Sequence, residues 1–221
     1  MRTVITAVGV VVPARDEGES IEACVRGVLA ALRRLPADVQ PALCVVADRC
    51  TDDTADVASA AVFGWPARVV ANGADATIGE IRDLGVRHLG LAGHRPAETW
   101  LLSTDADTVV APDWALRHLH LARHGIHAVA GATELLGRTV LPVHAYGANL
   151  GVRADAYRAV GGFGAVATGE DQDLWHRLVE AGFRCRYADG PRVLTSSRRQ
   201  GRAPHGVAAL LARLDRERDV L

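Results

Sequence analysis

Two carboxylates, Asp105 and Asp107, stand one residue apart in the segment LLSTDADTVVAP, at the end of an apolar run. Residues i and i+2 of an extended segment face the same side, so we expect the two side chains to point together. A hard divalent cation binds carboxylate oxygens and keeps positions for phosphate oxygens. The pair therefore predicts a metal that holds a diphosphate. A solvated turn that caps the helix expected after Pro112 is the alternative.

Short apolar runs alternate with helical patterns in the first half of the chain. We expect strands over residues 8–14, 42–48, 67–72 and 99–107, and helices over residues 20–35, 52–61, 77–91 and 112–125. Such alternation is typical of βαβ units in a parallel sheet whose strands are buried on both faces. Ligands bind these sheets beyond the carboxyl ends of the strands, so functional side chains are expected at that edge, here called the rim.

Polar residues follow each expected strand and should meet at the rim. In chain order they are Arg15, Asp16 and Glu17, then Asp48, Arg49, Asp52 and Asp53, then Asn72, and finally Asp105 and Asp107. We interpret Asp52 and Asp53 as helix-capping residues, and an ordinary turn residue is the alternative for Asp48. Because this rim is acidic, an anionic ligand would need a cation to bind there.

The second half of the chain is less regular. We expect a strand and turn over residues 127–138, a Gly- and Ala-rich stretch over 139–163, a helix over 169–183, two short strands over 184–197, a basic loop over 198–204 and an amphipathic helix over 205–221. Glu170 and Asp171 stand in the first turn of a helix, where its dipole favours acids. We expect one domain, with a nucleotide-type half over residues 1–125 and a substrate-facing half over residues 126–221.

The composition disfavours several classes of protein. The chain has 221 residues, 49% of them hydrophobic, and a formal net charge of −1, so no global field would attract nucleic acid or an anionic membrane. No uncharged apolar window reaches the roughly 18 residues of a membrane span, and the apolar start is interpreted as a strand instead of a signal peptide. Four cysteines without C-x-x-C spacing disfavour a disulfide framework or structural zinc and favour a cytoplasmic location.

Signatures of other common enzyme classes are missing from the sequence. No G-x-G-x-x-G follows the first expected strand, and no G-x-x-x-x-G-K-[ST] occurs, which disfavours Rossmann dehydrogenases and P-loop nucleotide hydrolases. There is no G-x-S-x-G elbow and no H-E-x-x-H helix. The histidines near the fourth helix are interpreted as a surface face of that helix, namely His118, His120, His124 and His127. Large aromatic side chains are expected in the core, namely Trp114, Trp175 and Tyr187.

Five segments occur in an order that a known family shares: VVVPARDE, VVADRCTDDTADVA, STDADT, GANLGVRADAYRAVGGF and GEDQDLWHRL. On these segments the chain resembles the family 2-type glycosyltransferases with the GT-A fold, and the resemblance covers about residues 8–195. The resemblance implies a single α/β domain, a Rossmann-like α/β/α sandwich around a central, mostly parallel sheet. It also implies a nucleotide-diphosphate sugar as donor, an acceptor hydroxyl, and an acceptor-binding role for the second half with its C-terminal helix.

The resemblance assigns roles to residues of the rim. Nucleotide binding is implied for Pro13, Ala14, Arg15, Glu17, Asp48, Asp105 and Ala106. A Mn²⁺ or Mg²⁺ ion is implied on Asp107 chiefly and on Asp105, where it would neutralise the leaving diphosphate. A general base is implied at Glu170 and Asp171, with Asp171 preferred, and one base with direct displacement would invert the anomeric centre. Ordinary first-turn acids are the alternative for this pair.

Further roles rest on the order of residues alone. His205 fits a further metal ligand, and Arg198, Arg199 and Arg202 fit diphosphate contacts, with a solvated basic stretch as the alternative. Asn149 is expected to contact the acceptor or the diphosphate, or else to be an ordinary turn residue. The family often has Asn in place of Asp16 and Asp-Gly-Ser where this chain reads DRCTDD. These departures leave the identity of the nucleotide base open.

Two other functions stay open at this point. A nucleotidyltransferase also joins a parallel sheet, a nucleotide and acidic metal ligands, but it would need a Gly-rich loop with a lysine where this chain reads PARDEGES. A GT-A module that binds a sugar nucleotide without turnover is the second alternative. The stretch between Arg138 and Asn149 is short, which favours a small-molecule acceptor, while a lipid-linked acceptor stays open. The sequence is also compatible with a homodimer.

Overall fold

The expected alternation of strands and helices is present in the computed structural model, which describes residues 3–136 and 144–197. The strands are β1 (Ala7–Ala14), β2 (Gln40–Asp48), β3 (Ala67–Asn72), β4 (Thr99–Ser103), β5 (Thr108–Val110), β6 (Ala128–Leu135), β7 (Leu150–Arg153) and β8 (Cys185–Thr195). The helices are α1 (Ile21–Leu32), α2 (Thr54–Ala61), α3 (Ile78–His88), α4 (Trp114–Arg123), α5 (Ala154–Ala159) and α6 (Glu170–Glu180). Two short 3₁₀ helices, η1 (Pro96–Glu98) and η2 (Gly147–Asn149), precede β4 and β7.

The described strands form one eight-stranded sheet in the order β3-β2-β1-β4-β7-β6-β8-β5. Strands β3, β2, β1 and β4 pair in parallel, as do β6 and β8, whereas β7 and β5 run antiparallel to their neighbours. The parallel half is made of the first four βα units of the sequence, so their carboxyl ends share one edge. This arrangement confirms the expected mostly parallel sheet.

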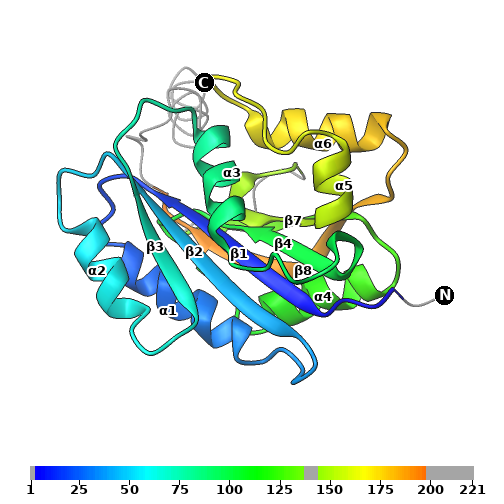
Figure 1. The fold of residues 1–221 in the computed structure, drawn as a ribbon, viewed down its shortest axis with the longest axis horizontal. Coiled ribbons are helices and arrows are strands. Elements are labelled where there is room, and N and C mark those ends of the chain that lie inside the picture. The colour runs from blue at the N-terminus through cyan, green and yellow to red at the C-terminus, as the bar shows by residue number, and fades with distance from the viewer. Residues whose placement is uncertain (1–2, 137–143, 198–221) are drawn as a thin grey trace, which may run out of the picture.

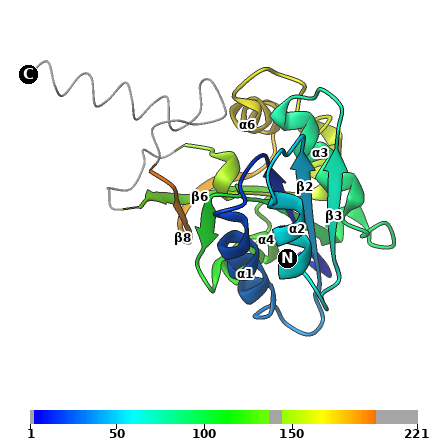
Figure 2. The same cartoon turned by 90° about the vertical axis from the view of Figure 1, so that its left-hand side faces the viewer.

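Helices cover both faces of the sheet (Figure 1). Helices α1, α2 and α4 pack on one face, and α3, α5 and α6 pack on the other (Figures 1 and 2). Alternate residues of β1 serve the two cores, with Val10 and Val12 on the α1 side and Val11 on the α3 side. Because both faces are covered, every residue of β1 is buried, and the expected α/β/α sandwich is confirmed.

The expected strand over residues 99–107 is shorter in the structure. Strand β4 ends at Ser103, and the backbone N–H of Thr108 donates to the carbonyl of Asp105 at 3.1 Å, which closes a turn before β5. Asp105 and Asp107 therefore lie in a turn and not in an extended segment, so the expectation that their side chains share one side of a strand is wrong. The first helix is also shorter than expected, because α1 ends at Leu32 before Pro36.

Residues 184–197 were expected to hold two strands, but they form the single strand β8 with a break in its register. Gly131 of β6 faces Ala188, while the next residue, Ala132, faces Arg192, so three residues of β8 bulge away from β6. A bulge leaves backbone groups without ladder partners. A side chain satisfies one of them here, since the amide nitrogen of Asn149 donates to the carbonyl of Pro191 at 3.0 Å.

Asn149 is a fully buried hub (0% exposed) and does not reach the rim. Its nitrogen donates to Ala132 and Pro191 carbonyls, and its oxygen accepts from Trp114 Nε1 at 2.8 Å and lies 3.2 Å from His118 Nε2. The expectation that its side chain contacts the acceptor or diphosphate is therefore wrong, because all its hydrogen-bonding capacity is used inside the core.

The prediction that His118 belongs to a surface face of its helix is also wrong, because its side chain is completely buried. Its ring lies edge-on to Trp114 at 5.4 Å between centroids. His120 and His124 are exposed as expected. Trp114 and Trp175 are buried as expected, but Tyr187 is exposed and packs on Trp175 at 4.7 Å between ring centroids.

In the part of the chain that the structure describes, no helix is long and apolar enough to cross a membrane.

Replacing Asn149 with Ala should lower the free energy of unfolding by about 2–4 kcal/mol, because Trp114 and two backbone carbonyls would lose buried partners. Urea unfolding monitored by tryptophan fluorescence measures this change. Asn72→Ala is the matched control at the rim, where the residue is only half-buried, and it should cost less than half as much. Equal losses for both variants would contradict the role of Asn149 as a hub.

Burial lowers the pKa of His118 from 6.5 to about 4, because it disfavours the charged imidazolium. The unfolded chain therefore binds this proton first as the pH falls, and stability is lost between about pH 6.5 and pH 4, by about 3 kcal/mol in total. His118→Gln keeps an N–H donor for Asn149 and removes the titration. Unfolding free energies of both proteins at pH 7 and pH 4 measure the effect, and a pH-independent difference between them would refute it.

Candidate functional site

The loops after β1 and β2 are joined by hydrogen bonds at the rim. The Asp16 carboxylate accepts from the backbone N–H of Thr51 at 2.6 Å and from its hydroxyl at 3.1 Å. The backbone N–H of Glu17 donates to the Thr54 hydroxyl at 2.7 Å. Asp16 and Arg49 have positive φ angles of 50° and 46°, which non-glycine residues rarely adopt. Strain of this kind is typical of functional sites and persists because the surrounding contacts enforce it.

Asp48, one of the residues with a predicted nucleotide contact, ends β2 at the rim. It is 7% exposed. Its Oδ1 accepts from Asn72 Nδ2 at 2.8 Å and lies 3.5 Å from Arg49 Nε, while its Oδ2 is 3.9 Å from Nη1 of the exposed Arg15. Asn72 and Arg49 therefore hold one carboxylate oxygen, and the other faces Arg15 across a longer gap. Such an oxygen can accept a hydrogen bond from a base or a ribose.

The other residues with predicted nucleotide contacts also lie around this edge. Pro13 and Ala14 are the buried last residues of β1, and Ala106 is buried in the turn after β4. Glu17 is buried, and its carboxylate accepts from the Ser20 hydroxyl at 2.8 Å. The structure thus brings together the ends of β1, β2 and β4, while the nucleotide-binding role of these residues stays a prediction.

Arg82 of α3 contacts two of the predicted site residues, Asp105 and Glu170, although the sequence did not lead us to expect it there. Its side chain is almost completely buried, with 3% of the residue exposed. Its Nη2 donates to Asp105 Oδ1 at 2.6 Å, its Nε donates to Glu170 Oε1 at 3.2 Å, and its Nη1 donates to the Ser103 hydroxyl at 2.5 Å. One guanidinium therefore joins the DAD turn to the acidic start of α6.

The buried charges around Arg82 alter one another's protonation. Burial by itself lowers the pKa of Arg82, but the carboxylates of Asp105 and Glu170 outweigh it, so the pKa is raised and the guanidinium stays charged. Burial raises the pKa of Glu170, and the positive charge of Arg82 opposes that rise. Arg82 and Glu170 can therefore both stay charged inside the protein, because each charge offsets the unfavourable burial of the other.

The two acids at the start of α6 have different surroundings. Helix α6 begins after Gly169, which has a left-handed φ of 77°. Glu170 is 6% exposed and faces Arg82. Asp171 is half-buried, and its Oδ2 accepts from the backbone N–H of Gly147 at 2.7 Å while its Oδ1 accepts from that of Gln172 at 2.8 Å. Asp171 is therefore the more accessible carboxylate of the pair.

The two acids of the DAD turn also differ in their partners. Asp105 Oδ1 is paired with Arg82. Asp107 Oδ1 lies 3.5 Å from the hydroxyl groups of Thr108 and Thr195, which are themselves 2.9 Å apart. Both residues are half-buried in one turn at the rim and supply carboxylate oxygens, so the donor set fits a hard divalent cation, and the roles of Asp107 and Asp105 as its ligands stay predictions.

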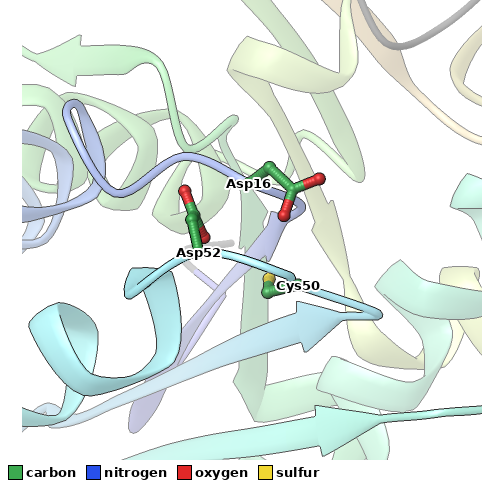
Figure 3. Close-up of side chains that lie close together, drawn as sticks. All are labelled: Asp16, Cys50 and Asp52. Atoms are coloured by element: carbon green, nitrogen blue, oxygen red, sulfur yellow. The ribbon is translucent and has the colours of Figure 1, made fainter.

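A different group of side chains has three ligand atoms close together. Among the described residues, Asp16, Cys50 and Asp52 have ligand atoms within 4.8 Å of one another, between the loops after β1 and β2 (Figure 3). Asp52 accepts from the backbone N–H of Gly18 at 2.9 Å and from that of Thr54 at 3.0 Å. Hydrogen bonds lower the pKa values of both acids. The group is explained by these loop contacts. The N-cap residue of α2 is Asp53, whose side chain makes no capping hydrogen bond, while Asp52, one residue earlier, accepts from the first N–H of the helix.

Four predicted site residues lie outside the described residues, namely Arg198, Arg199, Arg202 and His205. Their assignments stay predictions. Arg82, in contrast, had a usable signal in the sequence. The expected apolar face of its helix includes Ile78 and Ile81, and Arg82 is four residues after the first of these and adjacent to the second. An arginine on a buried helix face needs a charged partner, which predicts an ion pair but does not identify the acid.

Two family models match the sequence. The family described as "Glycosyltransferase like family 2" matches residues 6–154, and the one described as "Glycosyl transferase family group 2" matches residues 120–216. No curated protein sequence matches the chain.

Solved structures share the fold at low sequence identity. The mannosyltransferase PcManGT from Pyrobaculum calidifontis, in complex with GDP-Man and Mn²⁺, superposes with a TM-score of 0.71 at 16% identity over 91% of this chain and 61% of its own. TarS 1-349 from S. aureus, in complex with UDP-GlcNAc, has a TM-score of 0.71 at 14% identity over 94% of this chain and 65% of its own. The chain thus spans less than two thirds of the length of either.

These likenesses confirm the GT-A type of fold that the sequence predicted. The first family model covers more than half of the 221 residues, including the ends of β1 and β2 and the DAD turn. The second continues through α6 and its two acids. The chain therefore belongs to glycosyltransferase family 2.

Proposed function

We propose that this chain transfers a sugar from a nucleoside-diphosphate sugar to an acceptor hydroxyl, with a divalent cation and with inversion of the anomeric centre. One observation carries the proposal. Arg82 links Asp105 of the DAD turn to Glu170 of α6, at the edge of the sheet where the loops after β1 and β2 also lie. Donor-side and base-side acids from distant parts of the sequence therefore share one small region.

The donor nucleotide would bind at the ends of β1 and β2. Asp48 offers an acceptor oxygen for the base or ribose, held in place by Asn72. The exposed Arg15 lies beside this carboxylate, so its guanidinium can contact a ligand at the rim. The solved relatives bind GDP-Man and UDP-GlcNAc, which supports a sugar nucleotide and leaves the base to be identified.

The diphosphate would bind beside the DAD turn. Asp107, with Asp105 beside it, would hold Mn²⁺ or Mg²⁺, and the Mn²⁺ in the PcManGT complex supports this assignment. A bound divalent cation supplies Lewis-acid neutralisation of the negative charge on the leaving diphosphate. The turn keeps its shape because Thr108 donates to Asp105 and the hydroxyl groups of Thr108 and Thr195 contact each other.

Asp171 would act as the general base. It would accept the proton of the acceptor hydroxyl as the oxygen attacks the anomeric carbon. Two backbone N–H groups orient its carboxylate, and it is more accessible than Glu170. A single base and direct displacement give inversion. Because the stretch between Arg138 and Asn149 is short, a small-molecule acceptor is favoured over a polymer. A lipid-linked acceptor is the alternative.

Thermal unfolding in the presence of UDP-, GDP-, dTDP- and ADP-sugars, with and without Mn²⁺, tests the donor assignment. A ligand at 100 times its Kd stabilises the native state by about 2.7 kcal/mol, which raises the Tm of a domain of this size by roughly 5–10 °C. We expect a metal-dependent shift with one nucleotide, and its loss in Asp107→Ala. Asp113→Ala is the control, because Asp113 pairs with Arg117 of α4 and should leave the shift intact. A metal-independent shift would contradict the cation site, and no shift with any donor would favour a module without this activity.

Asp171→Asn should retain donor binding and lose sugar transfer, because an amide cannot accept the proton. We expect kcat to fall by about 10²–10⁴-fold, the usual contribution of a general base. The matched control is Asp173→Asn on the same helix, since Asp173 forms a pair with Arg177. Product formation measured at saturating donor distinguishes the two variants, and normal turnover by Asp171→Asn would remove Asp171 as the base.

A further inference from the structure

We infer that Arg82 is a positioning residue that fixes the DAD turn and the start of α6 relative to each other, so that the donor-side and base-side carboxylates are held as one unit. The inference rests on the proposed function for its catalytic consequence. Its structural content, a mechanical link between two motifs, can be tested without any substrate.

The contacts of Arg82 reach four separate parts of the fold. Its guanidinium donates to Asp105 in the DAD turn, to Glu170 at the start of α6 and to Ser103 at the end of β4. The carbonyl of Gly147 in η2 lies 3.5 Å from Nη1. Because Gly147 also donates its backbone N–H to Asp171, Arg82 and Asp171 contact the same residue of η2. The arginine thus supports the proposed base without touching it.

The surrounding backbone is shaped to admit this side chain. A Cβ atom at Gly147 would lie 2.4 Å from Arg82 Nη2, so only glycine allows the guanidinium to lie there. A Cβ atom at Gly79, one turn before Arg82 on α3, would lie 2.1 Å from the carbonyl oxygen of Gly164. Glycines at both positions let α3 approach the segment before α6 and η2 closely. The ring of Phe163 lies 5.8 Å from the guanidinium carbon.

The charges explain why the link needs an arginine. Asp105, Glu170 and Asp171 place three carboxylates around one cation, and Glu170 has almost no access to water. Removing the cation would leave a buried acid unpaired beside two others, which is strongly unfavourable. Lysine would keep the charge but offers a compact ammonium group, whereas the planar fork of arginine has five donors in fixed directions. One lysine cannot span Asp105, Glu170 and Ser103 with the same geometry.

Burial separates this role from ligand binding. Arg82 is 3% exposed, and all three nitrogens of its guanidinium donate to protein oxygens. Glu170 uses an oxygen to hold Arg82, which assigns it to positioning and leaves Asp171 as the base. Loss of Arg82 should therefore affect transfer more than donor affinity, because Asp48 is held by Asn72 and Arg49 and not by Arg82.

Hydrogen exchange and steady-state kinetics on Arg82→Gln, Arg82→Lys, Glu170→Gln and the double variant Arg82→Gln/Glu170→Gln test the inference. Arg87→Gln is the control, because Arg87 lies on the same helix but pairs with Asp83 at the surface. In Arg82→Gln we expect amide exchange to rise about tenfold or more both in residues 103–108 and in the first turn of α6, with little change in β1 and β2. We expect kcat to fall at least about 100-fold and the donor KM to change less than about fivefold, with Arg82→Lys between this variant and the wild type.

The double variant measures whether the effects of Arg82 and Glu170 on kcat depend on each other. Glu170→Gln should lower kcat at least about tenfold in the wild-type background but less than about threefold once Arg82 is Gln. Additive losses, or exchange that rises in only one of the two segments, would overturn the inference. If Arg82→Gln does not fold, hydrogen exchange is measured on Arg82→Lys and on the double variant, which removes both charges.

Failure of the inference can be told apart from failure of the proposed function. A wild-type protein that transfers sugar, together with an Arg82→Gln variant of normal kcat, would overturn the inference and leave the proposed function intact. A wild-type protein without donor binding, together with a joint rise in exchange in Arg82→Gln, would overturn the proposed function and support the link between the motifs.

Discussion

The guanidinium of Arg82 lies between carboxylates of two motifs that are far apart in the sequence, and water has almost no access to it. Burying a guanidinium and a carboxylate is unfavourable unless each charge is paired and hydrogen-bonded. The pairing of Arg82 with Asp105 and Glu170 therefore constrains the elements that surround it. Helix α3 must approach α6 closely, η2 must carry a glycine beneath the guanidinium, and β4 must end where Ser103 and Asp105 can accept its hydrogen bonds. Each requirement is met by a different element of the fold.

The neighbouring half of the rim is held by a different set of contacts. The loops after β1 and β2 contain left-handed non-glycine residues, Asp16 and Arg49, and are joined through Thr51 and Thr54. These hydrogen bonds compensate the backbone strain, while Asn72 and Arg49 hold Asp48 at the edge of the sheet. Rigid loops on a rigid sheet lose little entropy when a ligand binds. The loops after β1 and β2 and the carboxylates around Arg82 are thus held by different sets of contacts.

Behind the rim, a neutral network holds the second half of the sheet. Asn149 bridges β6 and β8 where their register breaks, and it also contacts Trp114 and His118 of α4. All four hydrogen-bonding positions of its amide are used, which is the condition under which a buried polar group stabilises a core. The break in β8 is therefore a supported feature, and η2 is fixed between this network and Arg82.

The sequence by itself determined the alternation of strands and helices, because hydrophobic periodicity is encoded over a few residues. It also predicted a site at the rim, with acids at Asp48, Asp105, Asp107, Glu170 and Asp171. It also carried the family, through five short segments in order. Tertiary structure alone decided the partners of these groups. The DAD acids lie in a turn instead of a strand, Asn149 and His118 lie in the core, and Arg82 joins two motifs. Each of these depends on which residues meet across the packed faces of the sheet. Periodicity can identify a buried face, but it cannot tell which distant side chain will neutralise a charge placed there.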